Sequence, residues 1–277
     1  MNMQAHNKEV SPLTKLELEL YLVKAVEIAR ANGQIMKECE IDITEAQQVL
    51  DRAEMNNIKN AATTKTEELL NSLGEEHHLF KHDDTEQERK GFEWICDYID
   101  GAYSYSLGHR VSVTSVALTL DGKSQVAVVY EPWTNRLYAA VRGGGFTVNG
   151  KTVALRTIKL EEGTLIDVEW WPWATYDIDT WLHNVSMETH AYVLHIGCIV
   201  YGACLVASGV FGAAVLGRTM EGKNHEIAAM KLIVEEAGGI ITDLKGLEIS
   251  HIGTIEGLLI ANNGVHGDLL SRVDFIK

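Results

Sequence analysis

The sequence contains little cysteine and no long apolar run. Its four cysteines form no Cys-x-x-Cys pair and have no histidine partners at zinc-ligand spacing. We therefore expect reduced, mostly buried thiols in a cytoplasmic protein, rather than a disulfide framework or a redox site. No apolar run reaches the roughly 18 residues that a membrane span needs, and the polar start MNMQAHNKEVSPLT is unlike a secretory signal. The sequence predicts no membrane partner.

Positive charge is also scarce. Lys and Arg number 24 against 39 Asp and Glu, which gives a formal net charge of −15. Nucleic acids and anionic membranes are bound mainly through Lys and Arg, so both classes of partner are disfavoured. A phosphate-binding site remains compatible with this charge if metal ions reverse the local sign. With 277 residues and 46% hydrophobic content, the chain has the composition of a soluble globular protein, built as one unit or as two closely packed halves.

The stretch EWICDYIDGA is the most informative part of the chain. Two carboxylates three residues apart, Asp97 and Asp100, lead into a glycine where a strand should give way to a helix. Hard cations such as Mg²⁺ prefer several oxygen ligands, and the carbonyl of Ile99 adds a third oxygen-bearing group. If a helix begins here, the N–H groups of Gly101 and Ala102 would face an anion. The stretch therefore predicts a site that holds a metal and a phosphate together.

This stretch and two other motifs resemble the inositol monophosphatase family of Mg²⁺-dependent, lithium-sensitive phosphomonoesterases. The family signature, W-x-x-D-P-I-D-G-T followed by an aromatic residue, stands here as WICDYIDGAYSY. Gly74-Glu75-Glu76 matches an upstream acidic motif, and NHEIAAMKLIVEEAGG lies where the family has W-D-x-A-A followed by E-A-G-G. The similarity runs from about Leu22 to the C-terminus. Three motifs in the right order make it specific, whereas D-x-x-D-G alone would be a weak signal.

The hydrophobic pattern predicts alternating helical and strand-rich regions. Helical periodicity extends to about Cys39 and recurs over residues 43–73, whereas residues 77–90 are charged and without periodicity, which predicts an exposed loop. VSVTSVALTL, QVAVVYEP and RLYAAVR alternate as strands do, and Asn149-Gly150 predicts a hairpin turn. Further helices are expected over residues 198–211 and 226–237.

The resemblance names this layered order as the αβαβα sandwich of the inositol monophosphatase and fructose-1,6-bisphosphatase type. It implies an N-terminal half, residues 1–153, that carries the metal-binding motifs. A C-terminal half, residues 154–277, would complete the site.

The resemblance also implies two bound cations, Mg²⁺ with Mn²⁺ as the substitute. The first would be held by Glu76, Asp97 and the carbonyl of Ile99, and would activate the attacking water. The second would be held by Asp97, Asp100 and Glu226 and would face the leaving oxygen. Glu76, Asp97 and Asp100 are accordingly the expected catalytic residues.

Phosphate, substrate and subunit contacts are implied in the same way. The N–H groups of Gly101 and Ala102 would bind the phosphate. The substrate would lie near His195, Gly197 and Cys198, where the family has R-S-x-G-S/T. Members of the family are generally homodimers, so a homodimer is expected here.

These residues also have plainer structural interpretations. Asp97 or Asp100 can cap a helix, and Glu76 can be an exposed loop acid. Glu226 is one methylene longer than the aspartate of the family and is compatible with an acid at a helix N-terminus. The glycine run at residues 143–145 is not followed by the helix start of a phosphate cradle, so it favours a structural hairpin.

Three departures from the family pattern bear on activity. Ala102 replaces a threonine or serine whose hydroxyl helps to orient the attacking water, and His225 replaces a tryptophan. The upstream D-x-V-T-x-x-D segment has no clear counterpart, and the nearest stretch places Lys65 about where its acid would be. Removing a water-orienting group commonly costs about 10²-fold or more in rate.

The sequence therefore supports two functional hypotheses. The first is a Mg²⁺-dependent phosphatase that hydrolyses a small phosphorylated polyol, sugar or nucleotide with metal-activated water. The second is a catalytically degenerate homologue that keeps the fold and acts by binding or regulation. Convergence of Glu76, Asp97, Asp100 and Glu226 in one cleft would favour the enzyme, and a salt bridge from Lys65 into it would favour the second hypothesis.

Overall fold

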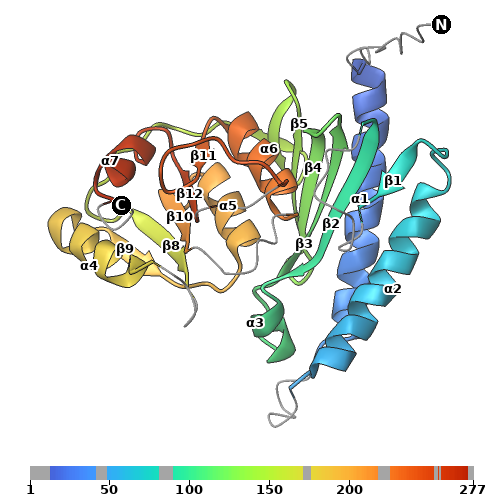
Figure 1. Ribbon diagram of the computed structural model, residues 1–277, viewed down its shortest axis with the longest axis horizontal. Coiled ribbons are helices and arrows are strands. Elements are labelled where there is room, and N and C mark those ends of the chain that lie inside the picture. Colours follow the sequence, from blue (N-terminus) through green and yellow to red (C-terminus); the bar gives the residue numbers. More distant parts are fainter. Residues whose placement is uncertain are drawn as a thin grey trace, which may run out of the picture.

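Helices and sheets alternate in five layers in the computed structural model (Figure 1). The structure describes residues 13–41, 49–80, 90–170, 176–217, 225–252, 255 and 257–273. Helices α1 (Lys15–Glu38) and α2 (Arg52–Leu70) cover the outer face of a seven-stranded sheet. Helices α5 (Ile199–Ala207) and α6 (Ile227–Ala237) lie between this sheet and a five-stranded one, whose far face carries α4 (Ile178–Thr189) and α7 (His266–Ser271). The predicted αβαβα sandwich is confirmed.

The larger sheet follows chain order from β1 to β7. Its strands are β1 (His77–Leu79), β2 (Phe92–Asp100), β3 (Val113–Leu120), β4 (Lys123–Glu131), β5 (Arg136–Val141), β6 (Gly145–Val148) and β7 (Lys151–Val153). β1 runs parallel to β2, and every later pair is antiparallel. The predicted strands are confirmed. The predicted hairpin turn is confirmed too, and its two residues, Asn149 and Gly150, both have positive φ. The loop predicted over residues 77–90 is wrong at its start, because residues 77–79 form β1.

The smaller sheet has the order β11-β12-β10-β8-β9. Its strands are β8 (Leu165–Glu169), β9 (Tyr192–Leu194), β10 (Ala213–Leu216), β11 (Ile240–Thr242) and β12 (Leu258–Ala261). The chain passes from one sheet to the other between Val153 and Leu165, where we expected the two halves to meet. One apolar cluster joins strands of both sheets to the helices between them, so the halves share a core.

Two capping boxes set the starts of the outer helices. Thr14 and Glu17 exchange hydrogen bonds at the start of α1, and Asp51 and Glu54 do so at the start of α2. The second helix therefore begins at Arg52, later than the predicted residue 43. The apolar face of α1 is narrower than its sequence suggests, since it buries Ala25, Ile28 and Ala29 but leaves Leu16, Leu20 and Val23 exposed.

The cysteines follow the expectation only in part. All four are free thiols, and Cys198 and Cys204 are buried, but Cys39 at the end of α1 is exposed. None of the helices in the described ranges is long and apolar enough to cross a membrane.

Candidate functional site

The junction predicted from EWICDYIDGA forms at the end of β2. Asp97 and Asp100 flank an irregularity in the β2–β3 ladder that takes the two residues between them out of register. The strand ends at Asp100, and the short helix α3 (Ala102–Ser106) starts after Gly101. Gly101 has φ +75°, a left-handed conformation that favours glycine. The strand-to-helix turn is thus where the sequence places it.

Asp100 is tied to the N-terminus of α5. Its Oδ2 atom accepts the backbone N–H of Val200 and the thiol of Cys198, both at 2.8 Å. A Cβ atom on Gly101 would lie only 2.8 Å from the carbonyl oxygen of Gly197. The structure therefore brings Asp100, Gly101, Gly197 and Cys198 together. The Cys198 thiol is buried and already engaged, so the predicted substrate contact would not use it.

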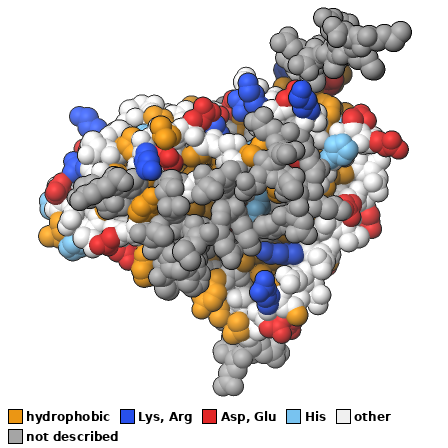
Figure 2. Space-filling view, in the orientation of Figure 1, with side chains coloured by type: hydrophobic (Ala, Val, Ile, Leu, Met, Phe, Trp, Pro, Cys, Tyr) orange, Lys and Arg blue, Asp and Glu red, His pale blue; other side chains and the backbone are white. Residues whose placement is uncertain are grey.

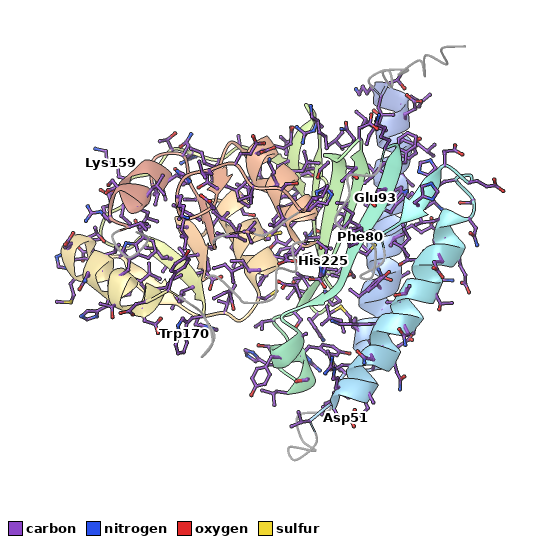
Figure 3. The ribbon with its side chains drawn as sticks, viewed as in Figure 1. Asp51, Phe80, Glu93, Lys159, Trp170 and His225 are labelled. Carbon is purple, nitrogen blue, oxygen red and sulfur yellow. The ribbon has the colours of Figure 1, made fainter. Side chains whose placement is uncertain are left out.

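Glu226 and His225 approach Asp97 from the start of α6. The Nε2 atom of His225 lies 3.8 Å from Oδ1 of Asp97, and its Nδ1 atom lies 3.7 Å from Oε2 of Glu226. His225 sits beside β2 where the central helices meet the larger sheet (Figure 3). The side chains of Asp97, His225 and Glu226 are 12%, 19% and 14% exposed, so the group is recessed but not sealed from solvent.

The charges of this group act on one another. Burial raises the pKa of Asp100 to about 6, with the negative charge of Asp97 adding to the rise. Burial raises the pKa of Glu226 to about 7, although the charge of His225 opposes it. Burial alone would raise the pKa of Asp97, but the hydrogen bond and charge of His225, with the charge of Lys59, hold it below its usual value. Asp97, Asp100 and Glu226 therefore form one electrostatic unit.

Glu76 does not belong to this unit. It immediately precedes β1, which runs parallel to β2 with His77 opposite Phe92, so it lies near the start of β2 while Asp97 lies near the end. Asp97 lies five residues beyond Phe92, the partner of His77, which is about 17 Å along the strand. Glu76 is exposed, and its carboxylate folds back beside Gly74. Our prediction that Glu76 binds the first cation is corrected on this ground, because an acid beside Asp97 has to follow β1.

The salt bridge from Lys65 into this group, which would have favoured the second hypothesis, is not among the ion pairs of the described residues. The Lys65 ammonium pairs at 3.1 Å with Glu68 on the exposed side of α2. The lysine that acts on Asp97 is Lys59, six residues earlier on the same helix. The comparison of this stretch with the family motif did not identify Lys59. The signal that could have found it is the helical spacing of Lys59, Thr63 and Thr66, which places all three on one face.

Two buried acids on β8 were also missed. Asp167 is fully buried and Glu169 is 4% exposed, and burial raises the pKa of each to about 7. Glu169 accepts the N–H of Cys198 at 2.7 Å, and its carboxylate lies 4.0 Å from the ring of His195. That ring lies beside Trp170 at the end of the strand (Figure 3). Two acids two residues apart in the apolar segment LIDVE share one strand face, which is the signal available in the sequence.

The donor chemistry fits one of the two expected cations. Asp97, Asp100 and Glu226 supply the carboxylate oxygens that Mg²⁺ prefers, and their mutual repulsion is what a bound cation would relieve. Of the other set, Glu76 lies apart from Asp97 within the described residues, and the charge of Lys59 acts on Asp97. Across the described ranges, no group of three or more His, Cys, Asp or Glu side chains already has a metal-binding arrangement.

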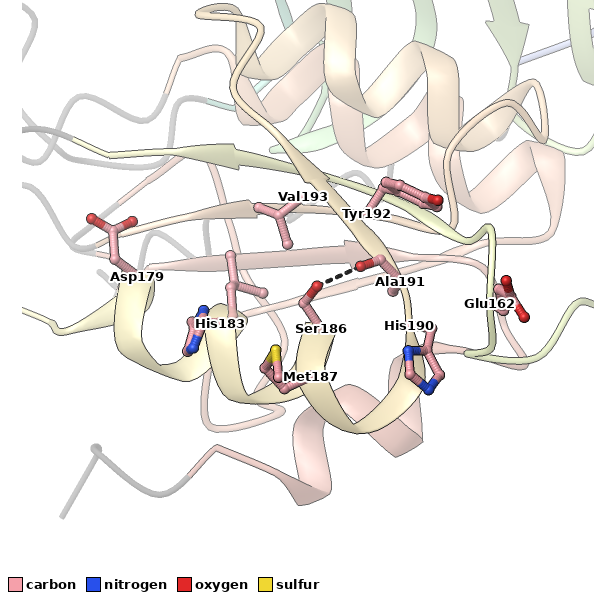
Figure 4. Close-up of a pocket in the computed structure, with 10 residues that line it drawn as sticks. Glu162, Asp179, His183, Ser186, Met187, His190, Ala191, Tyr192 and Val193 are labelled. Atoms are coloured by element: carbon pink, nitrogen blue, oxygen red, sulfur yellow. Dashed lines mark hydrogen bonds between the residues drawn. The ribbon is translucent and has the colours of Figure 1, made fainter.

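One open cavity among the described residues lies away from this junction. It has a volume of about 620 Å³ and lies between α4 and β9, where Asp179, His183, Ser186, His190 and Tyr192 line it (Figure 4). None of the motif residues lines it. On the face shown in Figure 2, the Lys and Arg side chains described occur in small separate groups rather than as one basic surface. Neither feature competes with the β2 junction as the candidate site.

Comparison with known proteins agrees with this fold. A model of the inositol monophosphatase family matches residues 10–274. The Nus factor SuhB of Escherichia coli (strain K12) is 27% identical over 246 residues, which cover 86% of this chain and 90% of that protein. The histidinol-phosphatase of Chlorobaculum parvum is 31% identical over 192 residues, 66% of this chain and 68% of that protein. An IMPase/NADP phosphatase complexed with Mg²⁺ and phosphate shares the fold, with a TM-score of 0.76 at 21% identity over 93% of this chain and 96% of that one.

Proposed function

Because this chain belongs to the inositol monophosphatase family, we propose that it is a divalent-cation-dependent phosphatase that hydrolyses a small phosphorylated molecule. The observation that carries the proposal is the convergence of Asp97, Asp100 and Glu226 from β2 and the start of α6. The relatives support it, since one is named a histidinol-phosphatase and another is complexed with Mg²⁺ and phosphate. A polyol, sugar or nucleotide phosphate is the class of substrate we propose.

In this proposal the three carboxylates would hold Mg²⁺ or Mn²⁺. When bound, such an ion supplies charge neutralisation at the phosphoryl oxygens and activation of water. The chain positions its own groups for this chemistry. The N–H of Ile99, at 3.2 Å, and His225 orient Asp97, and the N-terminus of α5 orients Asp100. The turn at Gly101 and Ala102 would bind the phosphate, and His195 and Gly197 would border the substrate.

The test of activity is a screen of phosphorylated metabolites with Mg²⁺ and with Mn²⁺, measured as released inorganic phosphate. Asp97→Asn is the matched background, because it keeps the size of the side chain and removes its charge. We expect release by the natural chain to exceed that of Asp97→Asn by at least about 10²-fold on one class of substrate. Equal rates for the two proteins on every substrate would reject the phosphatase.

Metal binding provides a second test at the same residue. Asp97→Asn should lower the affinity for Mg²⁺ at least about tenfold, because it removes a charged oxygen ligand from the centre of the group. Isothermal titration calorimetry measures this directly. Asp177→Asn, at the cap of α4, is the control and should leave the affinity unchanged. An unchanged affinity in Asp97→Asn would place the cation elsewhere.

A second candidate function is binding without turnover. The observation that favours it is the protein's own positive charge beside Asp97, from His225 and Lys59, together with the lack of a hydroxyl at Ala102. The Escherichia coli relative is named a Nus factor rather than by a reaction. Under this alternative the chain would retain a phosphorylated ligand, detected by calorimetry, while the screen shows no release of phosphate.

A further inference from the structure

We infer that Glu169 on β8 is a positioning residue of the cation site, which acts through Cys198 to fix the carboxylate of Asp100. The inference rests on the proposed function, because Asp100 matters here as a ligand of the cation. Glu169 belongs to the smaller sheet, whereas Asp100 ends a strand of the larger one. The site would therefore depend on both sheets.

The segment that joins β9 to α5 is held by two acids of β8. The backbone of β9 pairs with β8 as far as Leu194, which lies opposite Asp167. Beyond that point, side chains of β8 accept the N–H groups. Oδ1 of Asp167 accepts the N–H of Ile196 at 3.1 Å, and Oε1 of Glu169 accepts the N–H of Cys198 at 2.7 Å. Both acids are buried, so these hydrogen bonds form in a low-dielectric environment that strengthens them.

Cys198 links this segment to Asp100. It is the N-cap residue of α5, yet its side chain makes no capping hydrogen bond with the helix. Its thiol donates instead to Oδ2 of Asp100 at 2.8 Å, and the N–H of Val200 donates to the same oxygen at 2.8 Å. Asp100 therefore caps α5 from the other sheet. Two donors on one oxygen fix the orientation of the carboxylate, as hydrogen bonds to metal-binding carboxylates commonly do.

Close packing leaves the segment little room to move independently of Asp100. Gly197 has φ +82°, and a Cβ atom built on it would lie 2.7 Å from Oγ of Ser104 in α3. A Cβ atom on Gly101 would lie 2.8 Å from the carbonyl oxygen of Gly197 and 3.1 Å from Cβ of Cys198. At this packing density, a shift of the segment also displaces the turn that follows Asp100.

Glu169 acts through this segment rather than by direct contact with a substrate. It is 4% exposed, and its Oε1 atom is already engaged by Cys198. Its Oε2 atom lies 4.0 Å from Nε2 of His195, whose side chain is 48% exposed. The acid therefore supports, from the interior, the part of the segment that would border the substrate.

The affinity for Mn²⁺ tests the inference without reference to activity. It is measured by electron paramagnetic resonance of the free ion, titrated with the full chain. Cys198→Ala removes the thiol donor and should weaken binding about tenfold, because such partners orient the ligand. Cys198→Ser keeps a donor at this position and should bind within about twofold of the natural chain. Glu169→Gln replaces the carboxyl group with an amide, a weaker acceptor, and should weaken binding at least about threefold.

The two positions should also be coupled. If Glu169 acts only through Cys198, Glu169→Gln should weaken binding by less than about twofold in a chain that already carries Cys198→Ala. Effects that multiply would show that Glu169 acts by another route and would overturn the inference. Glu236→Gln is the matched control and should leave the affinity unchanged. Glu236 also accepts backbone N–H groups, those of Gly143 and Gly145 at 2.8 and 2.9 Å, but it lies near the C-terminal end of α6.

The outcomes separate this inference from the proposed function. A natural chain that binds no Mn²⁺ would overturn both. An unchanged affinity in Cys198→Ala or in Glu169→Gln would overturn the inference alone and leave a cation-dependent phosphatase intact. Binding by Cys198→Ser that is as weak as binding by Cys198→Ala would do the same, because packing rather than the donor would then matter. If Glu169→Gln fails to fold, Glu169→Asp serves instead, since it is one methylene shorter, and it should weaken binding to a similar extent.

Discussion

At the level of single residues, Ala102 is the departure whose effect can be measured most directly. It stands half-buried at the first position of α3, where the family signature carries a hydroxyl, beside the carboxylates that would hold the cation. Ala102→Thr should raise the rate of hydrolysis about tenfold if a water there lacks one orienting partner. Steady-state phosphate release at saturating Mg²⁺ gives the comparison.

The control for that change is Ala102→Val, which has the shape of threonine without its hydroxyl. If valine raises the rate as much as threonine does, the gain comes from packing rather than from a hydrogen bond. Pairing Ala102→Thr with Glu226→Asp should add to the gain if the longer side chain misplaces the cation. Background rates in both single variants and in the double variant would favour the binding alternative.

At the level of elements, the turn from β2 into α3 depends on the absence of a side chain at Gly101. Its φ is +75°, and a Cβ atom would lie 2.8 Å from the carbonyl of Gly197 and 3.1 Å from Cys198. Gly101→Ala should therefore lower the free energy of unfolding by about 2 to 4 kcal/mol, combining backbone strain with overpacking. Urea denaturation followed by circular dichroism measures the loss.

Gly150 supplies the matched control for this prediction. It has the same φ of +75° in the hairpin between β6 and β7, but no atom lies within 4 Å of a Cβ built there. Gly150→Ala should cost only the strain, about 1 kcal/mol. Equal losses in the two variants would mean that Gly197 and Cys198 move away from Gly101 at no cost, and that the junction is looser than its packing suggests.

At the level of the whole molecule, the buried acids predict how stability depends on pH. Folding raises the pKa of Asp100 to about 6 and of Asp167, Glu169 and Glu226 to about 7. A carboxyl group with a raised pKa stabilises the fold below its unfolded pKa, and this contribution is lost as pH rises through the folded value. Folding also raises the pKa of His225 to about 9, which adds a loss of stability as pH rises above neutral. The pKa of Asp97 is lowered instead, so its contribution to stability is lost only when pH falls below about 4.

The metal-free protein should therefore be most stable near pH 4, about the unfolded pKa of these carboxyl groups, and its free energy of unfolding should decrease toward pH 8. Urea unfolding in EDTA at several pH values provides the profile. Asp167→Asn should reduce the decrease by about 2 kcal/mol, because Oδ2 of Asp167 is buried and has no hydrogen-bond partner within the part of the chain described. A profile that is flat from pH 5 to pH 8 would show that these groups are hydrated.

The surface beside β9 bears on assembly. This strand is at the edge of the smaller sheet, and Tyr192 and Leu194 on it are 61% and 42% exposed, with Met187 and Trp170 also exposed nearby. We expect a homodimer that buries this apolar edge. Sedimentation equilibrium should give about twice the mass of the 30.7 kDa chain. Tyr192→Glu should shift it to the monomer, and a monomeric natural chain at micromolar concentration would remove the dimer.

The sequence by itself determined the parts of this protein that depend on local pattern. Alternation with a period of two predicted the antiparallel strands, helical periodicity predicted most helices, and Asn149-Gly150 predicted a hairpin. The carboxylates around Gly101 were found for the same reason, because a strand, a turn and a helix start leave their marks within a few residues.

Tertiary structure alone decided which distant residues meet. Whether Glu76 lies near Asp97 depends on the direction in which β1 pairs with β2, and a strand of three residues carries too little pattern to show it. The charge of Lys59 acts on Asp97 because α2 packs beside the end of β2, and Asp167 is buried because α5 packs against its strand. These contacts join residues that are far apart in the chain, and their free energy comes from packing and desolvation, which a local sequence pattern does not encode.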